Sequence, residues 1–408
     1  MIRIGIPKER RFQCIAYAVG FIFLCLPLFL DLIVIPVAGI PAFLSSSYKL
    51  MGFTQQKPMS MNLSLKSFFN REFQESVEHF AGNDLPLRSL LIRTNNQFYY
   101  SIFNKCYMYK SNIVVGKKGR LYEYGYIMGY NANRDAGLFR MEDIERSVRK
   151  IKELRDFFRA RGQFFFYLIT PSKAECYPEF IPNRFSCNIS AEPLWRNRFV
   201  EELDKSGILY LDASRLSLEN RDAYGIPLFP EKGTHWNQLA AALATREIVE
   251  LIRKTGHYEV DDFEFGCAVS QKPEGSDADL LGLANLLFPY RYPTAMVSIK
   301  PNKTDLRLKM ASVGGSFLDL PHRFLQQNHF IDVIDYFFYF DSVAFHEVKG
   351  EISARNPADY HDKRALYAPL LLADIVLLEG NVASVSLGNL NKLYDYIFND
   401  RRAAGHAQ

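Results

Sequence analysis

The segment Phe164–Thr170, FFFYLIT, constrains the fold more than any other part of the chain. It lacks the polar–apolar alternation of a strand with one face in water, so it predicts a strand buried on both faces, as in parallel sheets covered by helices. A helix is predicted just before this strand. Its apolar residues fall on one stripe and a glycine follows its last turn: Ile144, Val148, Ile151, Leu154, Phe158 and then Gly162.

This alternation of helix and strand continues along the chain. Further helices are predicted over 194–205 and from just after His235 to about Lys254, and further strands over 208–213, 308–313, 332–340 and 374–379. Strands that alternate with helices indicate an α/β fold with a parallel sheet flanked by helices. In such sheets ligands bind outside the carboxyl ends of the strands.

The N-terminal region predicts a membrane anchor. Phe12 to Leu30 runs nineteen residues without a charge, behind a basic flank, and a helix of that length spans roughly 30 Å, the thickness of a hydrocarbon core. The flank should stay in the cytoplasm and the rest of the chain should lie outside. We therefore predict a cytoplasmic flank and single transmembrane helix over 1–45, a stalk over 46–75 and one domain over 76–408. A cleaved signal peptide is the alternative.

Composition excludes some functions. The net charge of +4 comes without a basic block beyond the anchor flank, so nucleic-acid binding has no support. Four cysteines follow the anchor: Cys106, Cys176, Cys187 and Cys267. Cys176 and Cys187 would be the easiest pair to join, free thiols are equally compatible, and the spacing matches no zinc motif. We expect no metal and no cofactor.

Two stretches carry residues suited to acyl transfer. ASVGGSFLDL, Ala311 to Leu320, is a predicted strand that runs into two glycines and Ser316 before a helical pattern. A tight strand-to-helix turn exposes the serine hydroxyl, and backbone N–H groups around Gly314, Gly315 and Ser316 could hold an oxyanion. The second stretch is GTHWNQLAAAL, in which His235 lies in a loop before a predicted helix.

Together these stretches resemble the alginate O-acetyltransferase family. The similar segments, in order, are NDLPLRSLLIRTNNQFYY, VVGKKGRLYE, LITPSKAECYPEFIP, GTHWNQLAAAL, DADLLGLANLL, VGGSFLDL and DIVLLEGN. The resemblance implies an SGNH-hydrolase-like domain in the periplasm, anchored in the bacterial inner membrane. It also implies transfer of acetyl groups to an exported polysaccharide, with a multi-pass membrane acyltransferase as the partner that supplies them.

The family's residues map onto this chain at two positions, the nucleophile Ser316 and the base His235. Lys173, Tyr177 and Trp236 are further candidates for binding the substrate.

The resemblance fails where the family has an aspartate two residues before its histidine, because this chain has Gly233 there. That carboxylate normally orients the imidazole. Asp277 is our first candidate to replace it, and the others are Asp279, Glu231, Asp319 and a backbone carbonyl. An acetyl esterase with the same serine and histidine, and an inactive carbohydrate-binding module, are the alternative functions.

Overall fold

The computed structural model describes residues 50–52, 64–79, 88–106, 112–185, 192–255, 258–288, 290–303, 307–340, 342–348, 350–360, 363–384 and 387–400. These residues divide into two compact units. The first holds the described residues up to 106 together with 282–288. The second holds the described residues of 112–281 and from Tyr290 onward, and it contains the predicted α/β fold.

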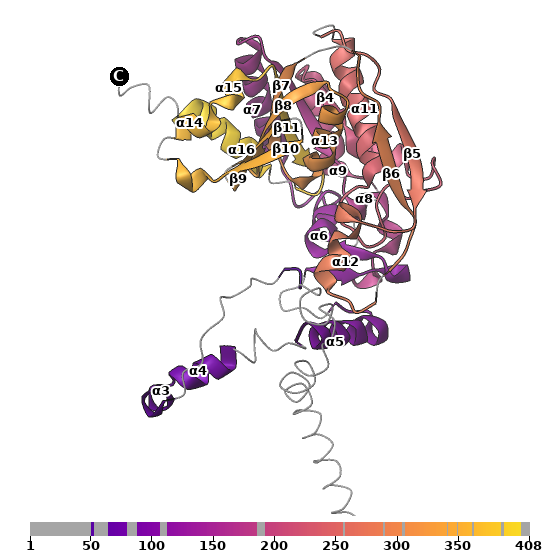
Figure 1. Ribbon diagram of the computed structural model, residues 1–408. Helices are drawn as coiled ribbons and strands as arrows, with labels where there is room; N and C mark the ends of the chain where they lie inside the picture. Colours follow the sequence, from indigo (N-terminus) through magenta and orange to yellow (C-terminus); the bar gives the residue numbers. More distant parts are fainter. Residues whose placement is uncertain are drawn as a thin grey trace, which may run out of the picture. The chain divides into compact units, whose positions relative to one another are not determined.

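A seven-stranded sheet forms the centre of the second unit (Figure 1). Its spatial order is β10 (Glu351–Arg355), β9 (Val343–Val348), β8 (Ile331–Phe338), β7 (Leu308–Gly314), β11 (Ile375–Asn381), β3 (Phe164–Thr170) and β4 (Tyr210–Asp212). The five strands from β8 to β4 pair in parallel, while β9 pairs antiparallel with β8 on one side and with β10 on the other. The sheet is therefore mixed, which corrects the prediction of a parallel one. The connections from β8 to β9 and from β9 to β10 are too short for the crossover that parallel strands need.

Each of the five predicted strands is present, and each belongs to the parallel part of the sheet. The predicted helices are also present, as α7 (Met141–Arg159), α9 (Leu194–Lys205) and α11 (Gln238–Lys254). Gly162 has a φ of +78°, which explains a glycine between α7 and β3, since other residues adopt this backbone conformation only with strain.

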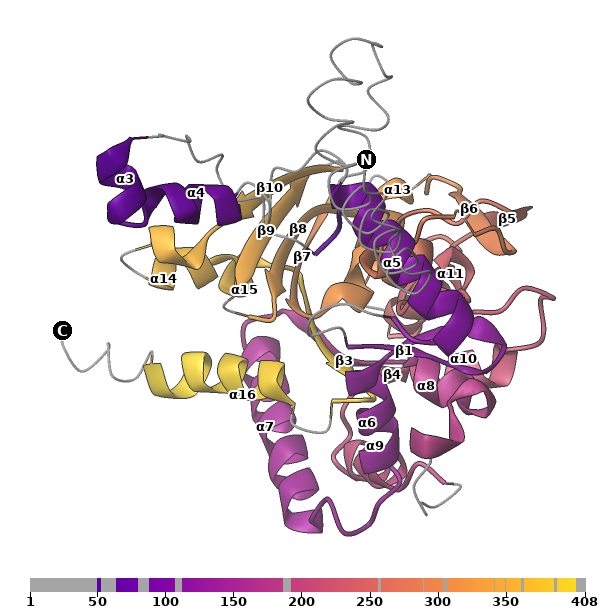
Figure 2. The same ribbon diagram turned by 90° about the horizontal axis from the view of Figure 1, so that it is seen from below.

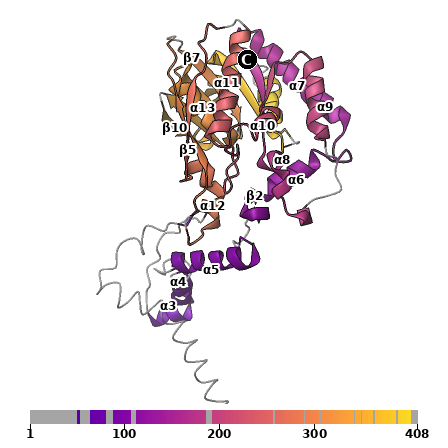
Figure 3. The same ribbon diagram turned by 90° about the vertical axis from the view of Figure 1, so that its right-hand side faces the viewer.

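Helices cover both faces of the sheet, so the unit has three layers (Figures 1 and 3). Alternate residues of β3 point to opposite faces, and all seven are buried. Phe164, Phe166 and Leu168 share a core cluster with residues of α11 and of α13 (Asp319–Gln327). Phe165, Tyr167 and Ile169 share another with residues of α7, α9 and α16 (Gly388–Asp395), and α7 and α16 lie side by side (Figure 2).

Smaller elements surround this sheet. Two small antiparallel sheets of two strands each, which we did not predict, are β1 (Ile113–Val115) with β2 (Leu121–Glu123), and β5 (Phe265–Ser270) with β6 (Thr294–Ile299). The remaining helices of this unit are α6 (Tyr124–Ala132), α8 (Lys173–Cys176), α10 (Ala213–Asn220), α14 (Lys363–Tyr367) and α15 (Pro369–Leu372). Helix α12 (Asp279–Ala284) begins in this unit.

The first unit contains α3 (Leu65–Phe69), α4 (Glu72–His79) and α5 (Arg88–Phe103). Asn96 on α5 donates a hydrogen bond of 3.0 Å to the carbonyl of Ala284, which ties α5 to the segment 282–288. Helix α3 lies in the predicted stalk, and the second compact unit begins at Asn112. Within the part of the chain that is described, no helix is long and apolar enough to cross a membrane. The predicted anchor, Phe12 to Leu30, lies outside that part.

Candidate active site

The structure brings Ser316 and His235 together. Ser316 follows the carboxyl end of β7 and opens the 3₁₀ turn Ser316–Leu318, which leads into α13. His235 lies in the loop before α11, whose first turn is capped by the side chain of Asn237. The Nε2 atom of His235 is 2.6 Å from the Oγ atom of Ser316.

The acid that contacts the histidine is Asp279, not Asp277. The Nδ1 atom of His235 is 2.5 Å from Oδ2 of Asp279, while Oδ1 of the same carboxylate accepts from the Thr234 N–H at 2.8 Å. With Nδ1–H donating to this acid, Nε2 is left to accept the hydrogen of the serine hydroxyl. Ser316, His235 and Asp279 thus form the same chain of contacts as a Ser–His–Asp triad.

Asp277, our first candidate, points elsewhere. Its carboxyl is buried and hydrogen-bonded to the hydroxyl of Thr294 on β6, and burial raises its pKa to about 6. Because Asp277 belongs to a 3₁₀ turn (Gly275–Ala278) and Asp279 starts the next helix, their side chains leave the chain in different directions.

Gly233 explains why the acid comes from another segment. A Cβ at this position would lie 2.5 Å from the carbonyl oxygen of Ser276 and 2.8 Å from that of Asp277. No side chain fits in that space, so an aspartate two residues before His235 is sterically excluded here. Because Gly233 lies so close to Ser276 and Asp277, Asp279, two residues after Asp277, reaches the imidazole of His235.

Two more carboxyls lie near His235. Burial raises the pKa of both Glu123 and Asp319, and the positive charge of the histidine, when protonated, lowers it. Both acids lie close enough to the imidazole to interact with its charge, and Asp279 is the acid in direct contact with Nδ1.

Hydrogen bonds to two buried side chains hold the backbone of the Gly–Gly–Ser turn in place. The N–H of Gly315 donates to Oε2 of the buried Glu379 at 2.9 Å, and its carbonyl accepts from the Tyr336 hydroxyl at 2.6 Å. The prediction that the Gly315 N–H holds an oxyanion is thereby corrected, because Glu379 already occupies it. The Ser316 N–H starts the 3₁₀ turn, where helical N–H groups have no intrahelical acceptor, so it is the backbone donor suited to that task.

The carbonyl of Gly314 also has a partner in this turn, the Tyr339 N–H at 2.8 Å. A Cβ on Gly314 would lie 2.6 Å from Leu318 and 2.7 Å from Cβ of Glu379. Gly314 is therefore a packing position that lets the turn lie against β11.

Tyr339 is a site residue that the sequence did not reveal. It follows β8 with a φ of +46°, and the next residue, Phe340, has a φ of +64°, which is rare for residues with a large side chain. This bend brings the Tyr339 hydroxyl into a hydrogen bond with the side chain of Ser316. Strained backbone of this kind clusters at functional sites.

A small cavity opens beside Ser316. Its volume is about 140 Å³, and its lining includes Tyr126, Tyr339, Asn381 and Leu390. That is well below the roughly 300 Å³ at which drug-sized ligand pockets begin. The cavity is suited to a short acyl group.

Lys173, Tyr177 and Trp236 support the site from inside the protein. The ammonium of Lys173 donates to the carbonyls of Leu121, Glu231 and Gly233 at 2.7–2.9 Å. The Tyr177 hydroxyl bonds to the backbone at Leu228 and Arg221, and Trp236 is only 1% exposed against Phe317. The structure thus places all three predicted substrate-binding side chains in buried positions, where they hold loops.

A second serine–histidine pair lies nearby, with its serine on β7 and its histidine on α13. Oγ of Ser312 is 2.9 Å from Nε2 of His322, and both side chains are buried. Burial lowers the pKa of His322 to about 3, and its Nδ1 atom has no hydrogen-bond partner. Without an acid and without access for a substrate, this pair cannot perform the chemistry open to Ser316 and His235.

Among the described residues, no group of three or more histidine, cysteine, aspartate or glutamate side chains could hold a metal ion. Cys176 is a buried free thiol whose pKa is raised by burial. Cys187, the cysteine with which Cys176 would most easily form a disulfide, lies outside the described residues.

Comparison with known proteins gives one family and several similar folds. Residues 113–320 match ALGX, the SGNH hydrolase-like domain of the acetyltransferase AlgX. A sequence search of curated proteins finds no match.

Similar solved structures include the O-acetyltransferase domain of Pseudomonas putida AlgJ, with 16% identity, a TM-score of 0.43, and 69% of this chain and 99% of that chain covered. Pseudomonas aeruginosa AlgX follows with 14% identity and a TM-score of 0.44, over 74% of this chain and 71% of that one. Bacillus cereus PatB1 has 13% identity and a TM-score of 0.38, over 62% and 93%.

Proposed function

The chain belongs to the ALGX family of SGNH hydrolase-like acetyltransferase domains, and we propose that it is an O-acetyltransferase that acts on the hydroxyls of an exported polysaccharide. The observation that carries the proposal is the chain of contacts Ser316–His235–Asp279, with heavy-atom distances of 2.6 and 2.5 Å. These lie within or at the short end of hydrogen-bonding distance, so the serine can lose its proton to the histidine as it attacks.

The first half-reaction forms an acyl-enzyme. The Ser316 hydroxyl attacks the carbonyl carbon of an acetyl donor while its proton passes to Nε2 of His235. The bond between that carbon and the donor's leaving group then breaks, and the leaving group takes the proton from His235. The acetyl group is left as an ester on Ser316.

The second half-reaction repeats these steps with a sugar. His235 takes the proton of a sugar hydroxyl, the sugar oxygen attacks the acetyl carbon, and the bond to Ser316 breaks as its oxygen takes the proton back. In both halves negative charge builds up on the acetyl oxygen. The Ser316 N–H and the Tyr339 hydroxyl are the donors that would stabilise it.

We also propose that the chain is anchored in the bacterial inner membrane by Phe12–Leu30, with the domain in the periplasm. The support is the uncharged run behind its basic flank. In this arrangement a multi-pass membrane acyltransferase supplies the acetyl groups from the cytoplasmic side.

Competition between water and sugar tests the proposal. The protein is given an activated acetyl ester, such as p-nitrophenyl acetate, and the lifetime of the acetyl-enzyme is measured with and without oligosaccharides. A transferase loses its acetyl group faster with an oligosaccharide and yields an acetylated sugar. Discharge at equal rates would indicate an esterase, and failure to form any acetyl-enzyme would indicate a binding module.

A further inference from the structure

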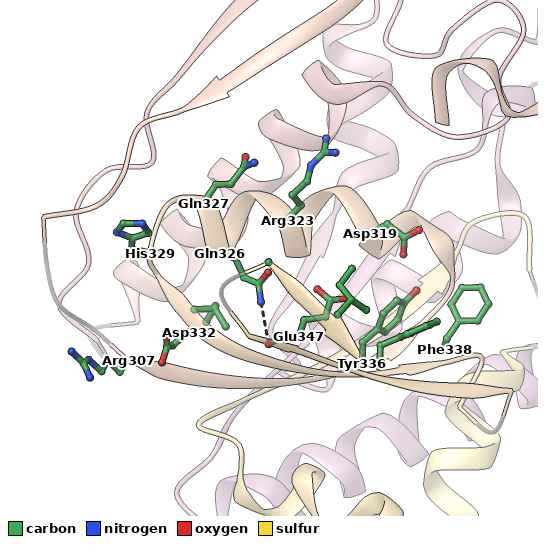
Figure 4. A pocket seen from close by; sticks show the side chains of 14 residues that line it. Arg307, Asp319, Arg323, Gln326, Gln327, His329, Asp332, Tyr336, Phe338 and Glu347 are labelled. Carbon is green, nitrogen blue, oxygen red and sulfur yellow. Dashed lines mark hydrogen bonds between the residues drawn. The ribbon is translucent and has the colours of Figure 1, made fainter. Parts of the chain in front are cut away.

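A large groove lies on the second unit beside the candidate active site, and the chemistry described above does not use it. Its cavity volume is about 1150 Å³, somewhat above the roughly 300–1,000 Å³ of typical ligand pockets. Helix α13 forms one side, and strands β8 to β10 form the other (Figure 4). A groove of this size accommodates a chain of several units.

One end of the groove adjoins the Gly–Gly–Ser turn. Asp319, on the first turn of α13, lines it three residues after Ser316. Tyr336 lines it and also bonds to the Gly315 carbonyl at 2.6 Å. Phe338 lines it too and directly precedes Tyr339, whose hydroxyl contacts Ser316. The lining of the groove thus includes Asp319, three residues after the nucleophile, and Phe338, the neighbour of Tyr339.

The apolar floor of the groove suits the C–H face of a sugar ring, and its polar sides suit the hydroxyl groups. The apolar side chains Tyr336, Phe338, Phe345 and Ile352 come from the sheet, and they suit the C–H face of a pyranose ring. Gln326 on α13 points toward Glu347 on β9 and donates to its carbonyl at 3.2 Å (Figure 4). Amide and carboxyl groups above an apolar floor are the kind of polar groups that fix a ligand's hydroxyls.

Acidic and basic side chains both line the groove. It is lined by three acidic side chains (Asp319, Asp332 and Glu347), and by Arg307, Arg323 and His329. The carboxyls of Asp319 and Glu347 lie nearest the aromatic floor, and burial together with the charge of Asp319 raises the pKa of Glu347 to about 7. In Figure 4, Arg323 points away from the sheet and Arg307 lies at the far end. A polymer with a carboxylate on each sugar would bring a further acidic group beside these two carboxyls, whose charged forms burial already disfavours.

We infer that this groove binds the acceptor, and that the acceptor is a neutral polysaccharide and not a polyuronate such as alginate. The inference rests on the proposed function, because only a transferase has a sugar acceptor.

Binding and turnover are measured separately to test it. The full-length protein is titrated calorimetrically with neutral hexasaccharides of glucose, galactose, mannose and N-acetylglucosamine, and with a mannuronate hexasaccharide. In parallel, p-nitrophenyl acetate hydrolysis reports on the acetyl-enzyme without any sugar. We expect at least one neutral hexasaccharide to bind and to speed discharge, and the mannuronate to do neither.

The groove is probed with Ile352→Glu, which places a longer, charged side chain at a position that is 64% exposed. Val269→Glu is the matched control, because Val269 is also an exposed β-branched residue, 59% exposed, on β5, outside the lining of the groove. Ile352→Glu should weaken neutral-sugar binding roughly tenfold and leave sugar-free hydrolysis unchanged. Val269→Glu should change neither.

Three results would overturn the inference while the proposed function stands: tighter binding of the mannuronate, binding of no neutral hexasaccharide, or equal effects of the two substitutions. If wild-type protein did not turn over the acetyl ester, the proposed function itself would fail.

Discussion

Asp279 shows how a triad can keep its geometry when one member moves to another segment. Its carboxylate reaches Nδ1 of His235 from the start of α12, 44 residues further along the chain. Oδ1 is fixed by the N–H groups of Thr234 and Leu280. An acid held by two backbone donors has little freedom to turn, so it can orient the imidazole as a neighbouring aspartate would.

The first prediction compares the two candidate acids. Asp279→Asn should lower acetyl-ester turnover by about two to four orders of magnitude, because an amide at this position favours the wrong tautomer of His235. Asp277→Asn is the control and should stay within a fewfold of wild type. In a His235→Ala background Asp279→Asn should have little further effect, since residues that act as a unit are not additive. Full activity of Asp279→Asn would exclude this acid from the mechanism.

The second prediction concerns Asp277 and pH. Its carboxyl has a folded-state pKa of about 6 instead of 3.8, so the folded protein holds this proton more tightly than the unfolded chain. The stability it contributes is fully present below about pH 4 and is lost as pH rises through 6, by at most about 3 kcal/mol. Asp277→Asn cannot ionise. Its free energy of unfolding relative to wild type should therefore rise between pH 4 and pH 7, as measured by urea unfolding, and a flat difference would contradict the buried charge.

The sequence could single out Ser316 and His235 because each lies in a local pattern, a strand that ends in two glycines and a loop that precedes a helix, and because the family resemblance marks both positions. It could not rank Asp279 above Asp277, because that choice depends on the direction of two side chains in one short turn. Tyr339 has no local signal at all, since its role comes from a backbone bend after β8.

At the scale of elements, the loop that carries His235 is held in place by Lys173. The ammonium on α8 bonds to three carbonyls, one on the β1–β2 hairpin and two on the loop itself. This lysine is 2% exposed and has three backbone acceptors, so it connects these segments inside the protein.

The third prediction follows from that role. Lys173→Met fills similar space but removes a donor from three carbonyls, of which that of Glu231 keeps the Leu121 N–H, so it should destabilise the protein by roughly 2–4 kcal/mol. Turnover should also fall because the loop is released. The control is Lys150→Met on the surface of α7, where the ammonium bonds to the exposed side chain of Asn391 and lies over the ring of Tyr394. Equal unfolding free energies for the two variants would show that the hydrogen bonds of Lys173 do not hold the loop in place.

The fourth prediction tests the packing at Gly233. Gly233→Ala should lower both stability and turnover, because its Cβ would overlap the backbone of Ser276 and rigid backbone cannot move away cheaply. For the same reason Gly233→Asp should not restore activity to Asp279→Asn, although it recreates the family's motif. Rescue by Gly233→Asp, measured as acetyl-ester turnover, would show that the loop can open.

At the scale of the whole molecule, the sequence predicted the parallel part of the sheet and missed the rest. Strands β3, β7 and β11 are apolar runs buried by helices, and burial of this kind leaves a clear pattern. Strands β5 and β10 are almost wholly exposed, so they lack the long apolar run that burial on both faces imposes on the central strands. The site lies at the carboxyl end of β7, where an α/β sheet is expected to place it.

The measurement that tests the central claim most directly is peptide mapping of the acetyl-enzyme. Protein is incubated with p-nitrophenyl acetate, quenched in acid and digested, and the acetylated residue is identified by tandem mass spectrometry. Ser312 and Ser316 lie four residues apart, and each has a histidine within 2.9 Å, so the map distinguishes two serine–histidine pairs in one protein. We predict acetyl on Ser316 alone, with slower labelling in Asp279→Asn. Acetyl on Ser312, or on lysines with Ser316 unmodified, would contradict the account.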